Sequence, residues 1–150
     1  MKRQKTIVVV DDNKGVLSAV KLLLKDKFDK ILTLPSPVTL MTTLKEEKPD
    51  VVLLDMNFGN GLNTGNEGLF WLHEIKKTYS SLPVVLFTAY GDIDLAVRGI
   101  KEGADDFIVK PWDNARLVET LLSVCHTSGK GKKMESLTPK SQMYWGESKA

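Results

Sequence analysis

The stretch VVLLDMNFGNGLNTGNEG, residues 51–68, joins four apolar residues to a single aspartate and then to a segment rich in glycine and asparagine. A short, continuous apolar run is typical of a strand buried on both faces, as in a parallel sheet covered by helices. The end of this strand has two interpretations. Either Asp55 carries a functional site, or the glycine-rich segment behind it cradles a phosphate.

The glycine-rich segment fits known phosphate-binding patterns poorly. Its core GNGLNTG, residues 59–65, has Thr64 where the dinucleotide pattern G-x-G-x-x-G requires its last glycine, and no Gly-Lys-Ser/Thr closes it. The dinucleotide pattern would also follow the first strand of the fold, not the third. We therefore interpret residues 58–68 as a lengthened connecting loop and look for the chemistry at Asp55.

Apolar runs and amphipathic helical patterns alternate along most of the chain. Strands are predicted at 7–10, 31–34, 51–54, 84–87 and 107–109, and helices at 14–27, 36–47, 69–80, 93–102 and 114–126. Gly103 is expected to stop the fourth helix. Right-handed connections leave few topologies, so this order predicts an α/β domain with a doubly wound, five-stranded parallel sheet flanked by five helices, the flavodoxin-like arrangement.

The composition, 42% apolar and 27% charged over 150 residues, is that of an ordinary globular domain. Residues 128–150 differ, because they are rich in Gly, Ser and Lys and carry five Lys against two Glu. We therefore predict one domain at residues 1–127 and a linker at 128–150. Cys125, the single cysteine, permits no intramolecular disulfide and is expected to be buried in the last helix. The apolar runs are too short to span a bilayer, so we expect a cytoplasmic protein.

Four predicted strands end in charged or hydroxyl side chains: Asp11 and Asp12 after the first, Asp55 after the third, Thr88 after the fourth and Lys110 after the fifth. Each has a simple structural explanation when taken alone; Asp12, for example, could cap the following helix. The carboxyl ends of parallel strands, however, meet at one edge of the sheet, where ligands bind. The sequence therefore predicts that these five side chains converge.

Three carboxylates at one place repel one another unless a cation lies among them. Oxygen ligands without His or Cys favour Mg²⁺ over zinc. Asp55 could then attack phosphorus and form an aspartyl phosphate, while Thr88 and Lys110 contact the phosphoryl oxygens. The predicted chemistry is phosphoryl transfer to an aspartate.

These motifs, in this order, resemble the receiver domains of two-component response regulators, which have the CheY-like form of the flavodoxin-like fold. The resemblance covers residues 6–126, and the motifs that carry it are VVVDDN at 8–13, VVLLDMN at 51–57, VVLFTAYG at 84–91 and GADDFIVKPW at 103–112. Two departures concern the loop after Asp55, which has no early proline and is about five residues longer than is usual in the family.

The resemblance implies a role for each matched residue at the predicted site. Asp55 would be the phosphoacceptor, and Asp11 and Asp12 the acidic pair that holds Mg²⁺ together with Asp55. Asn57 would add its main-chain carbonyl to the metal site. Lys110 would bind the phosphoryl group.

The resemblance also implies a conformational switch. Thr88 would move to the phosphate and the aromatic ring of Phe107 would follow, while the peptide bond before Pro111 would be cis. We further predict that Asn57 and Tyr90 tune the lifetime of the aspartyl phosphate. The face around Tyr90, Phe107 and the last two helices is expected to form a phosphorylation-dependent homodimer.

The implied phosphoryl donor is a sensor histidine kinase. The run DIDLAVRGIKEGADDFIVKPWDNARL, residues 92–117, looks most like receivers of the NtrC-like branch, and MYWGES, residues 143–148, looks like the start of a sigma-54-activating ATPase domain. The chain would then be an amino-terminal piece whose missing output domains bind DNA and activate transcription, so that DNA is contacted only through those domains and no membrane is involved.

Two alternatives remain open at this point. A haloacid-dehalogenase-like phosphatase also uses an aspartate at a strand end, but it requires Asp-x-Asp, and Asn57 stands where the second aspartate would be. A receiver-like module that binds partners without being phosphorylated is the other alternative, although every key residue is present.

Overall fold

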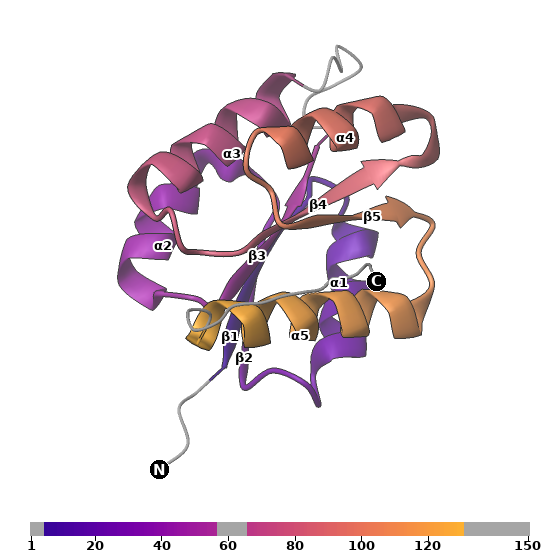
Figure 1. Cartoon of the computed structure of the whole chain (residues 1–150). Helices are drawn as coiled ribbons and strands as arrows, with labels where there is room; N and C mark the ends of the chain where they lie inside the picture. The colour runs from indigo at the N-terminus through magenta and orange to yellow at the C-terminus, as the bar shows by residue number, and fades with distance from the viewer. Residues whose placement is uncertain (1–4, 57–65, 131–150) are drawn as a thin grey trace, which may run out of the picture.

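The computed structural model describes residues 5–56 and 66–130, in which strands and helices alternate (Figure 1). The elements in chain order are β1 (Thr6–Val10), α1 (Lys14–Leu24), β2 (Lys30–Leu34), the 3₁₀ turn η1 (Pro37–Thr39), α2 (Leu40–Glu47), β3 (Val51–Asp55), α3 (Asn66–Thr78), β4 (Val84–Ala89), the 3₁₀ turn η2 (Tyr90–Asp92), α4 (Ile93–Lys101), β5 (Asp106–Lys110) and α5 (Asn114–Lys130). None of these helices is long and apolar enough to cross a membrane.

The five strands form one parallel sheet in the order β2-β1-β3-β4-β5. This order reverses direction after β1, which is the doubly wound, flavodoxin-like topology predicted from the alternation. The register pairs Asp55 with Phe87 and Ala89 with Lys110. The sheet therefore brings the carboxyl ends of its strands to one edge, and the predicted fold is confirmed.

Helices cover both faces of the sheet, with α2, α3 and α4 on one side and α1 and α5 on the other (Figure 1). Successive residues of a strand point to opposite faces, so Val8 and Val10 join the first core while Ile7 and Val9 join the second. All four are fully buried, which explains why the central strands read as continuous apolar runs.

Glycine lets two helices approach the sheet closely. A Cβ at Gly68 would lie 2.7 Å from the Cα of Met56, so α3 starts directly against the end of β3. A Cβ at Gly99 would lie 2.3 Å from Cδ1 of Leu86, so α4 lies close to β4. Gly103, predicted to stop the fourth helix, has φ +121°, a conformation that side chains disfavour.

The helix boundaries differ from the predictions in each helix: α3 begins three residues earlier and ends two residues earlier than predicted, α4 ends one residue earlier, and the other three differ as follows. The first helix ends at Leu24, where its carbonyl accepts hydrogen bonds from the N–H groups of Lys27 and Phe28 in the following turn. The second begins with a 3₁₀ turn, in which the N–H of Leu40 donates to the carbonyl of Pro37 and the Ser36 hydroxyl accepts from the N–H of Val38. The last helix continues to Lys130, so the first three residues of the predicted linker are helical.

The prediction that Cys125 is buried was only partly right, because the side chain is half-buried. Its Sγ lies 3.9 Å from the carbonyl oxygen of Asp50.

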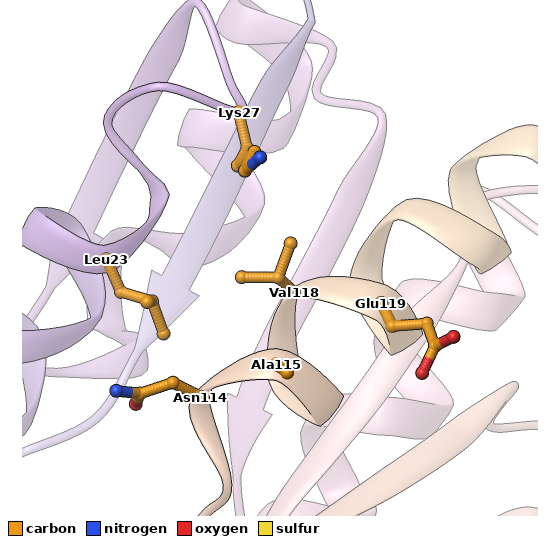
Figure 2. Close-up of a pocket in the computed structure, with 6 residues that line it drawn as sticks. All are labelled: Leu23, Lys27, Asn114, Ala115, Val118 and Glu119. Carbon is orange, nitrogen blue, oxygen red and sulfur yellow. The ribbon is translucent and has the colours of Figure 1, made fainter.

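On the same side of the sheet as Cys125, a surface hollow of about 510 Å³ lies between α1 and α5 (Figure 2). Its walls are Leu23, Lys27, Asn114, Ala115, Val118 and Glu119. None of the predicted site residues lines this hollow.

Candidate functional site

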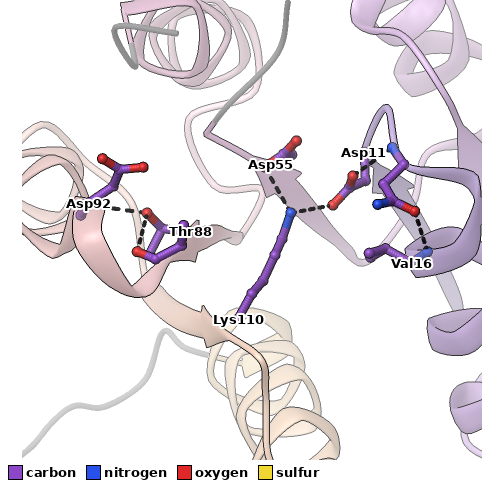
Figure 3. A network of polar contacts seen from close by, with 8 residues as sticks. Asp11, Val16, Asp55, Thr88, Asp92 and Lys110 are labelled. Carbon is purple, nitrogen blue, oxygen red and sulfur yellow. Dashed lines mark hydrogen bonds and ion pairs between the residues drawn. The ribbon is translucent and has the colours of Figure 1, made fainter. Parts of the chain in front are cut away.

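Charged side chains from three strands meet at the carboxyl edge of the sheet (Figure 3). Asp11 follows β1, Asp55 ends β3 and Lys110 ends β5. Asp11 and Asp55 are 0% and 1% exposed, which is unusual for carboxylates unless they are paired. The strand order thus brings these three side chains together, as the sequence predicted for them.

The Lys110 ammonium bridges the two buried carboxylates. Its Nζ lies 2.7 Å from Oδ2 of Asp11 and 3.1 Å from Oδ1 of Asp55. Burial by itself would lower the pKa of Lys110, but the hydrogen bonds and negative charges of the two aspartates outweigh it and raise the pKa above its ordinary value. Lys110 therefore stays charged and offsets part of the negative charge.

The negative charge still exceeds the positive charge at this edge. Asp11, Asp12 and Asp55 each offer one oxygen within 4.8 Å of the others, against the single ammonium of Lys110 that bonds two of them. Three carboxylate oxygens without sulfur or imidazole are the donors that a hard divalent cation such as Mg²⁺ prefers. The residues present therefore fit a magnesium site.

Helix capping does not account for Asp12. The side chain of Asn13 caps α1, because its Oδ1 accepts a hydrogen bond of 3.1 Å from the N–H of Val16. The N–H of Asn13 in turn donates to Oδ1 of Asp11 at 2.9 Å, which fixes that carboxylate. Asp12 is exposed beside the two buried aspartates.

Thr88 is fully buried, and its hydroxyl faces the turn after β4 (Figure 3). Oγ1 lies 3.3 Å from the main-chain oxygen of Asp92 and 3.5 Å from that of Ala89. The structure thus places Thr88 on the expected strand with its hydroxyl bonded to η2. The same bonds connect the site to the start of α4.

The other predicted residues lie around this centre, with one exception. Phe107 is half-buried on β5 and packs against the core under α4, while Tyr90 in η2 is 76% exposed. The peptide bond between Lys110 and Pro111 is cis, as the resemblance implied. Asn57, the predicted carbonyl ligand, lies outside the described residues, as does most of the loop 58–68.

Two aromatic residues that the sequence did not single out also border the site. The Lys110 ammonium lies over the ring of Phe87, 4.8 Å from its centroid, and the Phe87 ring contacts Trp112 with centroids 5.3 Å apart. The register between β4 and β5, which the structure supplies, places Phe87 and Lys110 on the same face of the sheet. From the sequence, Phe87 is simply the last residue of the predicted strand 84–87.

Comparisons with known proteins agree with this geometry. Residues 7–122 match the response regulator receiver domain family. An NtrX-like response regulator of Rickettsia bellii is 30% identical over 122 residues, which are 81% of this chain and 25% of that protein. The regulatory protein LuxO of Vibrio parahaemolyticus is 33% identical over 104 residues, which are 69% of this chain and 22% of that protein. These relatives support the NtrC-like branch.

A solved structure, the N-terminal signal receiver domain of a two-component response regulator from Bacteroides fragilis, is 69% identical and has a TM-score of 0.75. The alignment covers 82% of this chain and 98% of that domain. The chain spans about a quarter of the length of the first curated relatives that it matches. The fold, the residues at its carboxyl edge and the family match over residues 7–122 lead to one conclusion: the chain belongs to the receiver domains of two-component response regulators.

Proposed function

We propose that Asp55 accepts a phosphoryl group, and that Asp11, Asp12 and Asp55 hold the Mg²⁺ that receiver domains bind. The observation that carries this proposal is the Lys110 ammonium, which bonds the buried carboxylates of Asp11 and Asp55 at 2.7 and 3.1 Å. This arrangement holds the Asp55 carboxylate, at the end of β3, beside the Lys110 ammonium, which can contact a phosphoryl oxygen. The carbonyl of Asn57 completes the proposed metal site.

In the proposed reaction, a carboxylate oxygen of Asp55 donates an electron pair to phosphorus while the bond from phosphorus to the imidazole nitrogen of the kinase breaks. The electron pair of that bond returns to the imidazole. Lys110 shifts from Asp55 to an oxygen of the transferred group, whose negative charge it offsets. Bound Mg²⁺ supplies further positive charge beside the phosphoryl oxygens.

The proposed switch begins at Thr88. Its hydroxyl gives up the bond to the main-chain oxygen of Asp92, 3.3 Å away, and donates to the phosphoryl group. The turn η2 then loses a contact that holds it to β4, and the Phe107 ring moves into the space beside Thr88. The reaction at Asp55 thereby changes the surface formed by α4 and β5, which is a population shift between two states.

The surface of α4 supports a phosphorylation-dependent homodimer. Tyr90, Val97 and Ile100 are 76%, 43% and 37% exposed, and Ile93 between them is half-buried. Their helical spacing places these apolar side chains on one stripe. We propose that this stripe is the dimer contact and that Tyr90 and Asn57 tune the lifetime of the aspartyl phosphate.

The proposed biological role is signalling from a sensor histidine kinase to a transcription-activating output domain of the sigma-54-dependent type. This role requires single phosphorylation and slow dephosphorylation, not turnover of a substrate. The family match gives no support to a haloacid-dehalogenase-like phosphatase. A receiver-like module that is never phosphorylated would have no use for the charged arrangement around Asp55.

Intact-mass analysis after incubation with acetyl phosphate and Mg²⁺ tests the proposed site. We expect one added phosphoryl group in the wild type and in Asp26→Asn, a control at an exposed aspartate in the turn after α1, and none in Asp55→Asn. An equal adduct in Asp55→Asn would refute the assignment of the phosphoacceptor. Sedimentation with BeF₃⁻ and Mg²⁺ tests the dimer, and an unchanged mass would count against it.

A further inference from the structure

We propose that Phe87 is a positioning residue for Lys110, and that Trp112 holds the Phe87 ring in place. This inference rests on the proposed roles of Asp55 and Lys110 in phosphoryl transfer. It assigns a function to aromatic residues that otherwise read as core. We call the Phe87 and Trp112 rings together the aromatic platform.

The aromatic platform places a ring face against the lysine. The Lys110 ammonium lies over the Phe87 ring at 4.8 Å from the centroid, within the range in which the negative face of a ring attracts a cation. Only 22% of the lysine side chain is exposed, so solvent competes weakly with this contact. Phe87 itself is 0% exposed and cannot turn toward solvent.

Trp112 also contacts the Phe87 ring. The two rings are tilted by 51° with centroids 5.3 Å apart. The indole N–H of Trp112 donates a hydrogen bond of 2.9 Å to Oδ1 of Asn114, the first residue of α5. A chain of contacts therefore leads from the start of α5 through two rings to the ammonium.

The ring remains in place during the proposed reaction, whereas both carboxylate partners of Lys110 change. An oxygen of Asp55 becomes bonded to phosphorus, and Asp11 takes part in metal binding. A lysine has a long, flexible stem that must be held in position at an entropic cost. The Phe87 ring attracts the Lys110 ammonium without occupying the Asp55 carboxylate or a phosphoryl oxygen. It therefore keeps the ammonium near the reacting atoms when the ion pairs of Lys110 rearrange.

A purely structural role for Phe87 would depend on its volume, whereas the aromatic platform depends on the electron density of the ring. Site-specific replacement of Phe87 by mono-, di- and trifluorophenylalanine separates the two, because fluorine withdraws charge from the ring face at almost constant shape. The same series at Phe28 is the matched control, since that ring is 4% exposed in the same core but lies in the connection between α1 and β2.

The assay is the rate of phosphorylation by acetyl phosphate with Mg²⁺, together with the affinity for BeF₃⁻. We expect both to fall stepwise with fluorination of Phe87, by about 3- to 10-fold over the series, and to stay unchanged for Phe28. A flat Phe87 series in proteins that melt at the wild-type temperature would overturn the inference. Trp112→Phe is expected to retain most of the rate and Trp112→Leu to lose it; equal rates would overturn the role of Trp112.

Nuclear magnetic resonance of the protein without phosphoryl donor tests the platform independently. The ε-methylene protons of Lys110 are expected at unusually high field because of the Phe87 ring current, and this shift should vanish in Phe87→Leu. Its absence in the wild type would overturn the inference. Failure of the wild type to be phosphorylated at Asp55 would instead refute the proposed function, so the two failures are distinguishable.

Discussion

The substitution Asp12→Asn is expected to stabilise the protein when no divalent cation is present. Asp12 belongs to a group of three aspartates whose oxygens lie within 4.8 Å of one another, and Lys110 bonds the other two. The amide keeps the shape of the side chain and removes one negative charge. Because Asn13 and not Asp12 caps α1, no cap is lost.

The size of the effect follows from the charge separation. Two unit charges 4.8 Å apart repel by about 0.9 kcal/mol at the dielectric constant of water, the appropriate value for exposed Asp12. Two carboxylate neighbours give about 1.7 kcal/mol, and the Lys110 ammonium and salt screening reduce this to about 1 kcal/mol. For a domain of this size, the gain corresponds to a rise in Tm of roughly 3–6 °C.

Urea unfolding with EDTA measures the stability gained by Asp12→Asn without metal, and urea unfolding with increasing Mg²⁺ measures the stabilisation by metal that this variant loses. Saturation at 100 times the Kd should raise the free energy of unfolding of the wild type by about 2.7 kcal/mol, and that of Asp12→Asn by much less. The two stabilities should therefore cross as Mg²⁺ increases, while the control Asp26→Asn follows the wild type. An Asp12→Asn protein that is less stable than the wild type in EDTA, or that gains the full Mg²⁺ increment, would refute the reasoning.

Two further predictions concern α4. Gly99→Ala places a Cβ 2.3 Å from Leu86 Cδ1 and should lower the free energy of unfolding by about 1–3 kcal/mol. The control Gly91→Ala, whose Cβ would have no atom within 4 Å, should change the free energy of unfolding by less than about 0.5 kcal/mol. Equal effects of the two substitutions in urea unfolding would contradict the close approach of α4 to β4. The hydrogen bond from Arg98 is the main cause that lowers the pKa of Glu102. The ionised Glu102 carboxylate therefore stabilises the folded protein above the unfolded pKa of this group, and the stabilisation is lost as pH falls through its folded pKa. Urea unfolding from about pH 6 to about pH 2 should thus show a stability difference between the wild type and Glu102→Gln that shrinks with acid, and a constant difference would contradict this.

The sequence was sufficient to predict the fold and the members of the charged group, because both depend on pattern and topology. Asp11, Asp55 and Lys110 each end an apolar run, and parallel strands must bring their carboxyl ends together. The roles of these residues remain proposals, but their convergence needed no knowledge of side-chain conformation. The strand order alone implied it.

The features that the sequence could not supply depend on side-chain direction and on tertiary contacts. Nothing local to Thr88 indicates that its hydroxyl bonds the main chain of η2 and does not face Asp55. The contact of Phe87 with Lys110 required the register between β4 and β5, which apolar periodicity does not reveal. Helix ends depend on similar detail, which explains the longer α5.

The positions of the charged residues follow from the sheet. Asp11, Asp55 and Lys110 are carried by β1, β3 and β5, whose relative positions are set by main-chain hydrogen bonds of the sheet. The apolar residues before them are fully buried, for example Val9 and Leu53 at 0% exposure. This burial offsets the cost of placing like charges together at the strand ends. A chain built this way can vary the loop between β3 and α3 in length without moving the carboxylates, because loop length adds little to the cost of closing the loop.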